Sequence, residues 1–192
     1  MPRKNLHTPI AEAEISDLNL GDIVYLNGDV YTARDQAHHR ILDYADGGKE
    51  VPIKSGATIY HCGPLVRPQG NNWQIIAAGP TTSARMNEPT PAVIKQLRIH
   101  AIIGKGGMDI ATRAAMRKYG CVYLGITGGA AVLAATRIKA VKAVYWADLG
   151  MPEAVWHFIV EDFGPLVVSI DADGDSLYER TNEAAKRNVM AL

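Results

Sequence analysis

Four residues with chemically useful side chains follow stretches that we expect to be buried strands. They are Arg34, Thr81, Arg85 and Lys105, each shortly after the end of an apolar, β-prone run. Open α/β sheets usually bind ligands at the carboxyl ends of their strands. Because guanidinium and ammonium groups bind carboxylates through charge-assisted hydrogen bonds, these positions are candidates for a local anion site.

The first three of these residues also have ordinary structural explanations. Arg34 precedes a helix expected at 35–44, where it could grip a carboxylate beside free backbone N–H groups or simply pair with an acidic neighbour. Thr81 and Arg85 are four apart, so they share a face if their loop winds into a helical turn. The run of hydroxyls from Thr81 to Ser83 is equally typical of a helix N-cap. The residues alone leave these alternatives open.

Lys105 lies in the glycine-rich segment 104–107, Gly-Lys-Gly-Gly. The segment matches neither the Walker A phosphate loop nor the dinucleotide-binding glycine fingerprint. It fits the GXXG loop with which KH domains clamp a nucleic-acid backbone. A tight strand-to-helix turn with a solvent-facing lysine explains it as well, and the neutral charge balance of the chain argues against RNA binding.

The residue types that bind metals lack the spacing of a metal site. Cys62 and Cys121 are isolated, and we expect both to be buried structural thiols. The segment 171–175, Asp-Ala-Asp-Gly-Asp, resembles a calcium loop, but its glycine comes too early and no closing Glu follows, so we expect a turn. The adjacent His38 and His39 cannot both face one ion. Core or surface roles are expected for these two and for the scattered histidines His61, His100 and His157. No metal ligand is predicted in this chain.

The composition indicates one folded domain, which we place at 1–192. The chain is 47% hydrophobic, enough for a well-packed core. Its 20 Lys and Arg balance 20 Asp and Glu, so it has no global basic field for nucleic acid or anionic membranes. No apolar run approaches the roughly 20 residues of a membrane span, and no secretory leader is seen at the start. We expect a soluble, cytoplasmic protein.

The chain pattern predicts a hairpin at 23–33 with its turn at 27–29, then the helix at 35–44 and a strand at 57–62. The Pro, Gly and Asn residues of 63–72 mark a crossover between a β-rich part and an α/β part. From there, short strands alternate with helical stretches. The expected strands are 73–79, 99–104, 121–127, 139–146 and 165–171, and the expected helices are 91–98, 109–118, 128–137, 148–163 and 177–190.

Seven stretches, taken in order, carry a more specific signal. They are GDIVYLNGDVYTARDQAHHRI, the Gly63-Pro64 break, GPTTSARM, IIGKGGM, KYGCVYL with the TGGAA that follows it, DLGMPEAVW and DADGDSLY, and they span about 21–178. Together they resemble the β subunit, or C-terminal domain, of class I fumarate hydratases and the related L-tartrate dehydratases. Each stretch alone is weak, but the whole set in this order is specific.

The resemblance implies an α/β fold of the swivelling β/β/α kind, with a β-rich N-terminal part and an α/β C-terminal part. It implies an iron-sulfur-dependent hydro-lyase that reversibly hydrates fumarate to (S)-malate together with an α subunit. In that family the α subunit, and not this chain, holds the 4Fe-4S cluster. The alternative is the β subunit of L(+)-tartrate dehydratase, which the sequence does not separate from the first.

By the same resemblance, Arg34, Arg85 and Lys105 bind the substrate carboxylates and Thr81 is the catalytic base. Asn87 departs from the Asp expected after the Arg-Met pair, which weakens an ion pair near Arg85 or marks a different substrate. The resemblance gives no chemical role to four further residues, which we expect to serve packing or subunit contacts. They are Trp146, Asp148, Glu153 and His157.

Two further functions compete with this hypothesis. A regulatory or structural subunit that has lost activity is one, but such a chain has no need to keep all four candidate residues. A KH-like RNA-binding protein is a distant second. An isolated chain could also form a homodimer through the surface meant for its α subunit.

Overall fold

The computed structural model describes residues 3–190 and shows a mixed α/β fold. Its main sheet has seven strands in the order β1-β2-β3-β6-β7-β9-β8, and β4 and β5 form a separate two-stranded sheet. The strands are β1 (Arg3–Thr8), β2 (Ile23–Thr32), β3 (Thr58–Tyr60), β4 (Leu65–Gln69), β5 (Asn72–Ala77), β6 (Ala101–Gly104), β7 (Val122–Gly125), β8 (Ile138–Tyr145) and β9 (Val155–Ile170). The predicted α/β class is confirmed.

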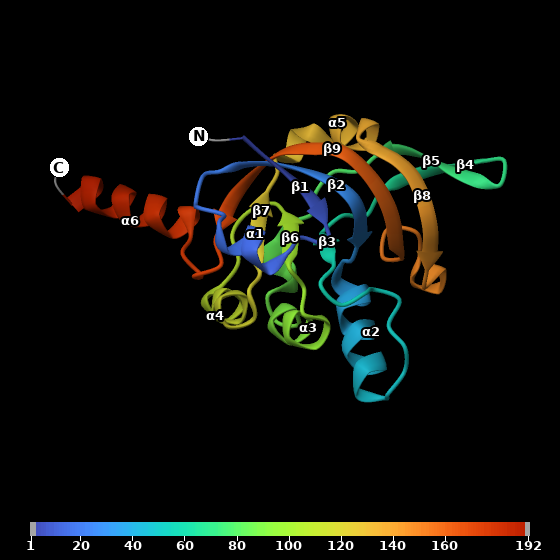
Figure 1. Ribbon diagram of the computed structural model, residues 1–192, viewed down its shortest axis with the longest axis horizontal. Coiled ribbons are helices and arrows are strands. Elements are labelled where there is room, and N and C mark those ends of the chain that lie inside the picture. The colour runs from blue at the N-terminus through green and yellow to red at the C-terminus, as the bar shows by residue number, and fades with distance from the viewer. Residues whose placement is uncertain (1–2, 191–192) are drawn as a thin grey trace.

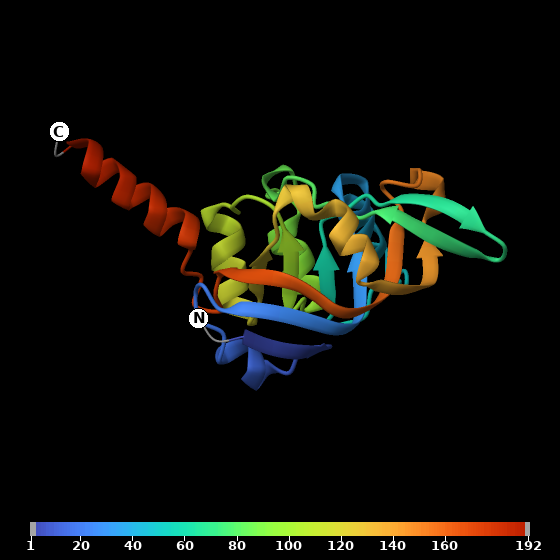
Figure 2. The same cartoon turned by 90° about the horizontal axis from the view of Figure 1, so that it is seen from above.

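The helices cover the sheet from two sides. The α-helices are α1 (Glu12–Ser16), α2 (Asp35–Asp46), α3 (Thr90–Leu97), α4 (Ile110–Tyr119), α5 (Ala131–Thr136) and α6 (Leu177–Met190), and the 3-10 helices are η1 (Ser83–Met86), η2 (Gly128–Ala130) and η3 (Ala147–Leu149). Figure 1 shows α2, α3 and α4 below the strands and α5 above β9. In Figure 2, α6 projects from one end of the molecule and the β4–β5 hairpin from the other.

Five strands of the main sheet close into a ring. The parallel pairs β2–β3, β3–β6 and β6–β7 are followed by antiparallel pairs of β9 with both β7 and β2. One face of these strands contributes to a buried core that includes Leu26, Leu124 and Phe158. The other face packs on α2, α3 and α4 through residues such as Ile59 and Ile102. Two cores therefore hold the parallel strands in place from both sides.

The predicted hairpin at 23–33 is wrong, because β2 is a single strand of ten residues. Gly28 has φ +102 and lies at an irregularity in the pairing of β2 with β9, not at a turn. A Cβ at Gly28 would stand 2.7 Å from Thr8 Oγ1 of β1. The Asn-Gly-Asp sequence is typical of a hairpin turn. In this protein its glycine instead allows an irregularity in β2 and the close approach of β1.

The helix expected at 148–163 is also wrong. Only Ala147–Leu149 is helical there, and the long strand β9 begins at Val155. Trp156 and Phe158 belong to one core, which matches the two-residue period of a strand. An apolar run rich in β-branched and aromatic residues fits a buried helix or a buried strand, and the pairing of β9 with three other strands decided between them.

The predicted β-rich first part and α/β second part share one main sheet. The late strands β8 and β9 pair with each other, and β9 also pairs with the early strand β2. The segment 63–72 is not a crossover, since it contains β4 and the turn into β5. The helices predicted at 35–44, 91–98, 109–118 and 177–190 are confirmed within one or two residues.

Candidate functional site

The carboxyl ends of four neighbouring parallel strands meet at one edge of the sheet. In register, Thr32 of β2 lies beside Tyr60 of β3, Tyr60 beside Ile103 of β6, and Gly104 beside Gly125 of β7. Arg34 follows β2 by two residues and Lys105 follows β6 directly. The expectation that candidate residues gather at strand ends is therefore met for these two.

The segment that carries Thr81 fits between the ends of β3 and β6. The Thr81 backbone N–H donates to the His61 carbonyl at 2.8 Å. Thr82 forms an isolated parallel bridge with Lys105, and the Ser83 N–H donates to the Lys105 carbonyl at 3.0 Å. The backbone thus holds Thr81 and Lys105 on adjacent extended segments.

The two arginines meet through carboxylates. Arg85 Nη2 lies 2.8 Å from Asp35 Oδ2, and Arg34 Nη2 lies 3.9 Å from the same oxygen. On its other side, Arg34 Nε lies 3.2 Å from Glu153 Oε1, an ion pair whose angle makes no hydrogen bond. Glu153 Oε2 also accepts from the Gln36 N–H at 2.9 Å, in the first turn of α2. Asp35 and Glu153 therefore fix the positions of the two guanidinium groups.

Lys105 differs from the two arginines in its charge environment. Within residues 3–190 it has no carboxylate within ion-pair distance, whereas Arg34 has two and Arg85 has one. The site contains three cations and two carboxylates, Asp35 and Glu153, which leaves one net positive charge. The edge therefore presents an excess of positive charge on the loop of Lys105.

The helical turn that would put Thr81 and Arg85 on one face, one of the two alternatives left open by the sequence, does not include Thr81. The 3-10 helix η1 begins at Ser83, so Thr81 lies in extended backbone outside it. The alternative N-cap explanation is not realised either, since Thr82 at the N-cap makes no side-chain cap hydrogen bond. The hydroxyl of Ser83 takes part in a hydrogen-bond network instead.

Ser83 is the centre of a buried polar network beneath the loops. Its Oγ lies 2.9 Å from His61 Nδ1, 2.8 Å from the Tyr123 hydroxyl and 3.3 Å from the Lys105 N–H. Glycine at position 104 makes this approach feasible, because a Cβ there would stand 2.0 Å from Ser83 Oγ. Burial raises the pKa of the Tyr123 hydroxyl, so this group stays protonated and can donate.

Two buried histidines extend this network toward Arg34. His38 Nδ1 lies 2.8 Å from the Arg34 carbonyl, and the rings of His38 and His61 are 5.2 Å apart between centroids. Burial lowers the pKa of His38 to about 4 and the pKa of His61 well below its ordinary value. Both rings are therefore neutral at pH 7.

Sequence reasoning missed several residues that shape this edge. Glu153 received no chemical role, yet it pairs with Arg34; its membership in the DLGMPEAVW stretch was the available signal. Asn87 makes no side-chain hydrogen bond to an arginine among the described residues. Its Oδ1 accepts from the Asp109 N–H at 3.2 Å at the start of α4. Asn87 thereby ties the loop of Arg85 to the loop that follows Lys105.

The remaining unassigned residues have structural partners. Asp148 pairs with Arg40 at 2.7 Å, and Trp146 packs edge-on against Tyr44. His157 is hydrogen-bonded to Asp29. These contacts fit the expectation of packing roles.

The described residues offer no site for a metal cluster. Within 3–190 no group of three His, Cys, Asp or Glu is placed to hold a metal ion. Cys62 and Cys121 are both buried and unpaired with each other, and burial raises the pKa of the Cys62 thiol to about 12. Such thiols do not fit a 4Fe-4S cluster, whose ligands are thiolates. The segment 171–175 is the expected turn, closed by hydrogen bonds from the N–H groups of Asp173 and Asp175 to Asp171.

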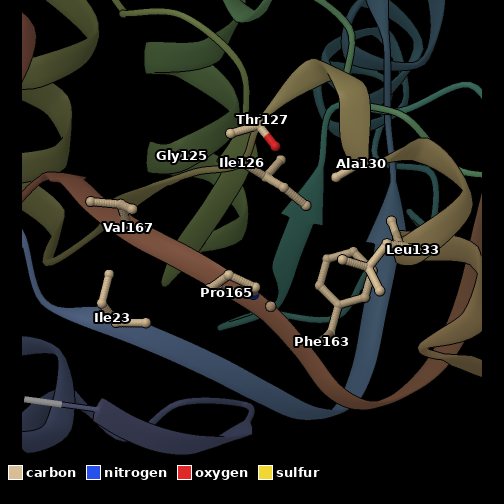
Figure 3. A pocket seen from close by; sticks show the side chains of 11 residues that line it. Ile23, Gly125, Ile126, Thr127, Ala130, Leu133, Phe163, Pro165 and Val167 are labelled. Atoms are coloured by element: carbon tan, nitrogen blue, oxygen red, sulfur yellow. The ribbon is translucent and has the colours of Figure 1, made fainter.

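A cavity of about 220 Å³ lies beyond the end of β7, between α5 and the crossing of β2 with β9. Figure 3 shows Phe163 of β9 and Leu133 of α5 facing the same space. Among the described residues that line it, Thr127 alone has a side chain with a hydrogen-bonding group, and none is charged. The cavity therefore suits an apolar group and not a dicarboxylate.

Among the described helices, none is long and apolar enough to span a membrane.

Comparison with known proteins identifies the family of the chain. A family model described as the fumarase C-terminus matches residues 2–181. The chain belongs to this family. The L(+)-tartrate dehydratase β subunit of Escherichia coli K12 is 39% identical over 176 residues, covering 91% of this chain and 86% of that protein.

Two further relatives show the same similarity in different chain layouts. A protein of Methanocaldococcus jannaschii, provisionally named as an L(+)-tartrate dehydratase β subunit, is 44% identical over 185 residues, 95% of each chain. A protein of Geobacillus stearothermophilus, provisionally named as a class I fumarate hydratase, is 42% identical over 176 residues, 91% of this chain but 33% of that protein. The family thus occurs both as a separate chain and as part of a longer one.

Proposed function

We propose that this chain is the substrate-binding half of a hydro-lyase that reversibly hydrates fumarate to (S)-malate. The observation that supports this most directly is that the four candidate residues lie at one edge of the sheet. Arg34 and Lys105 follow the strands β2 and β6, and Thr81 and Arg85 lie on the segment that packs between the ends of β3 and β6. Membership of the fumarase C-terminus family supports it independently.

The charges of this edge suit the proposed substrate. Fumarate is a dianion, and proton removal beside a carboxylate builds further negative charge. Arg34 and Arg85 are held in place by Asp35 and Glu153, so they bind carboxylates from preset positions. Lys105 supplies the positive charge that no described carboxylate neutralises, which favours an anion beside it.

We further propose that Thr81 is the base at the carbon that loses its proton. A free hydroxyl is a weak base, and nearby positive charge lowers its pKa. The backbone bridge between Thr82 and Lys105 puts the backbone of Lys105 on the segment next to Thr81, which supports this role for its ammonium. Lys105 is therefore assigned two tasks, which are to bind a carboxylate and to activate Thr81.

The exposure of the edge supports a partner. The Arg85 side chain is 52% exposed, and ion pairs in contact with water are weakened by solvent and salt. A second chain that covers this edge would exclude water and strengthen every charge interaction on it. We propose that this partner is an α subunit and that it carries the 4Fe-4S cluster, which the described residues of this chain do not fit.

The test is anaerobic co-purification of this chain with its native partner, followed by cluster reconstitution. Ultraviolet absorbance then follows the loss of fumarate, in parallel with an assay of tartrate dehydration. We expect fumarate turnover by the complex and none by this chain alone. Turnover or a bound cluster in the singly expressed chain would contradict the division of the site between two subunits.

Dehydration of L(+)-tartrate is the second candidate. The two relatives that this chain matches over 95% and 86% of their own length carry that name. Tartrate is also a four-carbon dicarboxylate, so the same three cations can hold it. Turnover of tartrate without fumarate in the assay above would keep the roles of the residues and replace the substrate.

A further inference from the structure

His38 and His61 form a pair that the proposed roles of Arg34, Thr81, Arg85 and Lys105 leave without a task. Both side chains are fully buried, at 0% exposure, and their rings meet edge to face. Each ring uses Nδ1 for a hydrogen bond, and neither Nε2 has a partner among the described residues. Each unpartnered buried nitrogen costs free energy, so the fold keeps this pair of rings in contact at a cost to stability.

The partner of His38 decides its tautomer. Its Nδ1 lies 2.8 Å from the carbonyl of Arg34, and a carbonyl can only accept. Nδ1 of His38 therefore carries the proton, and its Nε2 is left with a lone pair.

The partners of Ser83 decide the tautomer of His61. The Lys105 N–H and the Tyr123 hydroxyl both donate to Ser83 Oγ and occupy its acceptor sites. The Ser83 proton is then directed to His61 Nδ1 at 2.9 Å, which must accept. The proton of His61 is consequently on Nε2. His61 Nε2 is thus a donor and His38 Nε2 an acceptor, and the two rings pack edge to face without a hydrogen bond between these atoms.

We propose that His38 and His61 are a pair of neutral positioning residues in opposite tautomers, which links the loops of the site from beneath. One end of the chain of contacts is the Arg34 carbonyl at the start of α2. The other end is Ser83, which binds the Lys105 backbone and lies two residues from Thr81. The pair holds the residue that grips substrate in a fixed relation to the residues assigned to proton removal. Its kinetic consequence rests on the proposed function, whereas its protonation state does not.

The direct test is nuclear magnetic resonance on the full chain, labelled with ¹⁵N histidine. Long-range ¹H–¹⁵N spectra at pH 7.5 distinguish the two neutral tautomers from the cation. We expect the proton on Nδ1 for His38 and on Nε2 for His61. The same tautomer in both rings, or a charged ring in either, would overturn the pairing whether or not the chain belongs to an active enzyme.

The second test is a double-mutant cycle in the reconstituted complex. His38→Asn and His61→Asn each keep a group near Nδ1 and remove the Nε2 edge. Each variant should lower kcat/KM by about tenfold or more, since misplacement by about 1 Å costs up to about 100-fold. The double variant should lose no more than either single variant, because one change already breaks the link. The matched control is His39→Asn at the exposed neighbour, which should leave kcat/KM unchanged.

The outcomes separate the two proposals. Losses that add in the double variant, or single variants with wild-type kinetics, would overturn the positioning role and leave the hydro-lyase intact. A wild-type complex that turns over neither fumarate nor tartrate would overturn the proposed function, and the tautomers would still test the pair.

Discussion

Two clusters of the described residues are built around buried histidines, and the histidines of the two clusters differ in whether their hydrogen-bond partners are neutral or charged. At the strand ends, His38 and His61 have neutral partners and the nearby cations lie on loops. In the middle of the sheet, His157 of β9 is hydrogen-bonded to Asp29 of β2. The cluster of His38 and His61 lies at the strand ends and contacts loops, whereas the cluster of His157 lies within the strands and joins them.

The second cluster satisfies its own charges. Lys142 Nζ of β8 lies 3.3 Å from Asp29 Oδ1, and Tyr31 stacks on His157 with centroids 4.2 Å apart. Burial raises the pKa of Asp29, but hydrogen bonds from His157 and Lys142 outweigh it and hold that pKa below its ordinary value. Burial also raises the pKa of Tyr31 to about 12. The cluster ties three strands together and leaves no unbalanced charge for a ligand.

The largest expected effect tests which cluster carries function. Lys105→Ala in the reconstituted complex should lower kcat by roughly 10²–10³-fold, the usual cost of losing one preorganised donor. Steady-state kinetics on fumarate measures it. Lys142→Ala is the matched control, since it removes a lysine from the other cluster. If both variants lose activity alike, the contrast between the clusters is wrong.

The second prediction concerns acid stability. His38 and His61 are neutral in the fold, while the unfolded chain takes up protons below the ordinary pKa of 6.5. Stability is therefore full above pH 6.5 and declines as pH falls toward 4, by roughly 3 kcal/mol for His38 alone. Burial outweighs the hydrogen bond to the Arg34 carbonyl and the charge of Asp35, which both raise the pKa of His38, while His39 lowers it further. Urea unfolding at a series of pH values from 7.5 to about 5 measures the decline.

The control for this prediction is His39→Asn, which should keep the wild-type dependence on pH because His39 is exposed. His38→Asn should make the curve flatter over the same range. An unfolding free energy that does not change between pH 7.5 and about 5 would show that these rings take up protons in the fold as readily as in the unfolded chain.

The third prediction isolates the positioning of Arg34. Glu153→Gln keeps a hydrogen-bond acceptor for the Gln36 N–H and removes the charge beside Arg34. We expect kcat/KM to fall by about tenfold, because the guanidinium loses the group that fixes it. Asp148→Asn removes a carboxylate that pairs with Arg40 outside the site and should have no kinetic effect. Unchanged kinetics in Glu153→Gln would mean that Arg34 is held by other contacts.

The smallest effect is expected in the middle of the sheet. Asp29→Asn should lower the free energy of unfolding by about 1 kcal/mol or less, since its side chain is 38% exposed and solvent screens the charges. The kinetics of the complex should stay unchanged. A loss of turnover without a loss of stability would assign the second cluster a functional role that the contrast denies.

Much of the site was predictable because local sequence encodes strand ends. Apolar runs that end before Arg34 and Lys105 indicate where a parallel sheet exposes its carboxyl edge, and the structure places both residues there. The hairpin and the helix at 148–163 failed for one reason. Local turn and apolar patterns fit more than one structure, and the pairing of β9 with β2 selected the strand in both segments.

The sequence by itself determined the α/β class, the family and the four candidate residues, because each depends on residue types in a fixed order. Only the tertiary structure decided what holds those residues. Glu153 reaches the start of α2 from 117 positions away, and Ser83 joins His61 to Tyr123 across 22 and 40 positions. Contacts between segments so far apart leave no periodic signal in the chain, since they arise from strand order and not from local spacing.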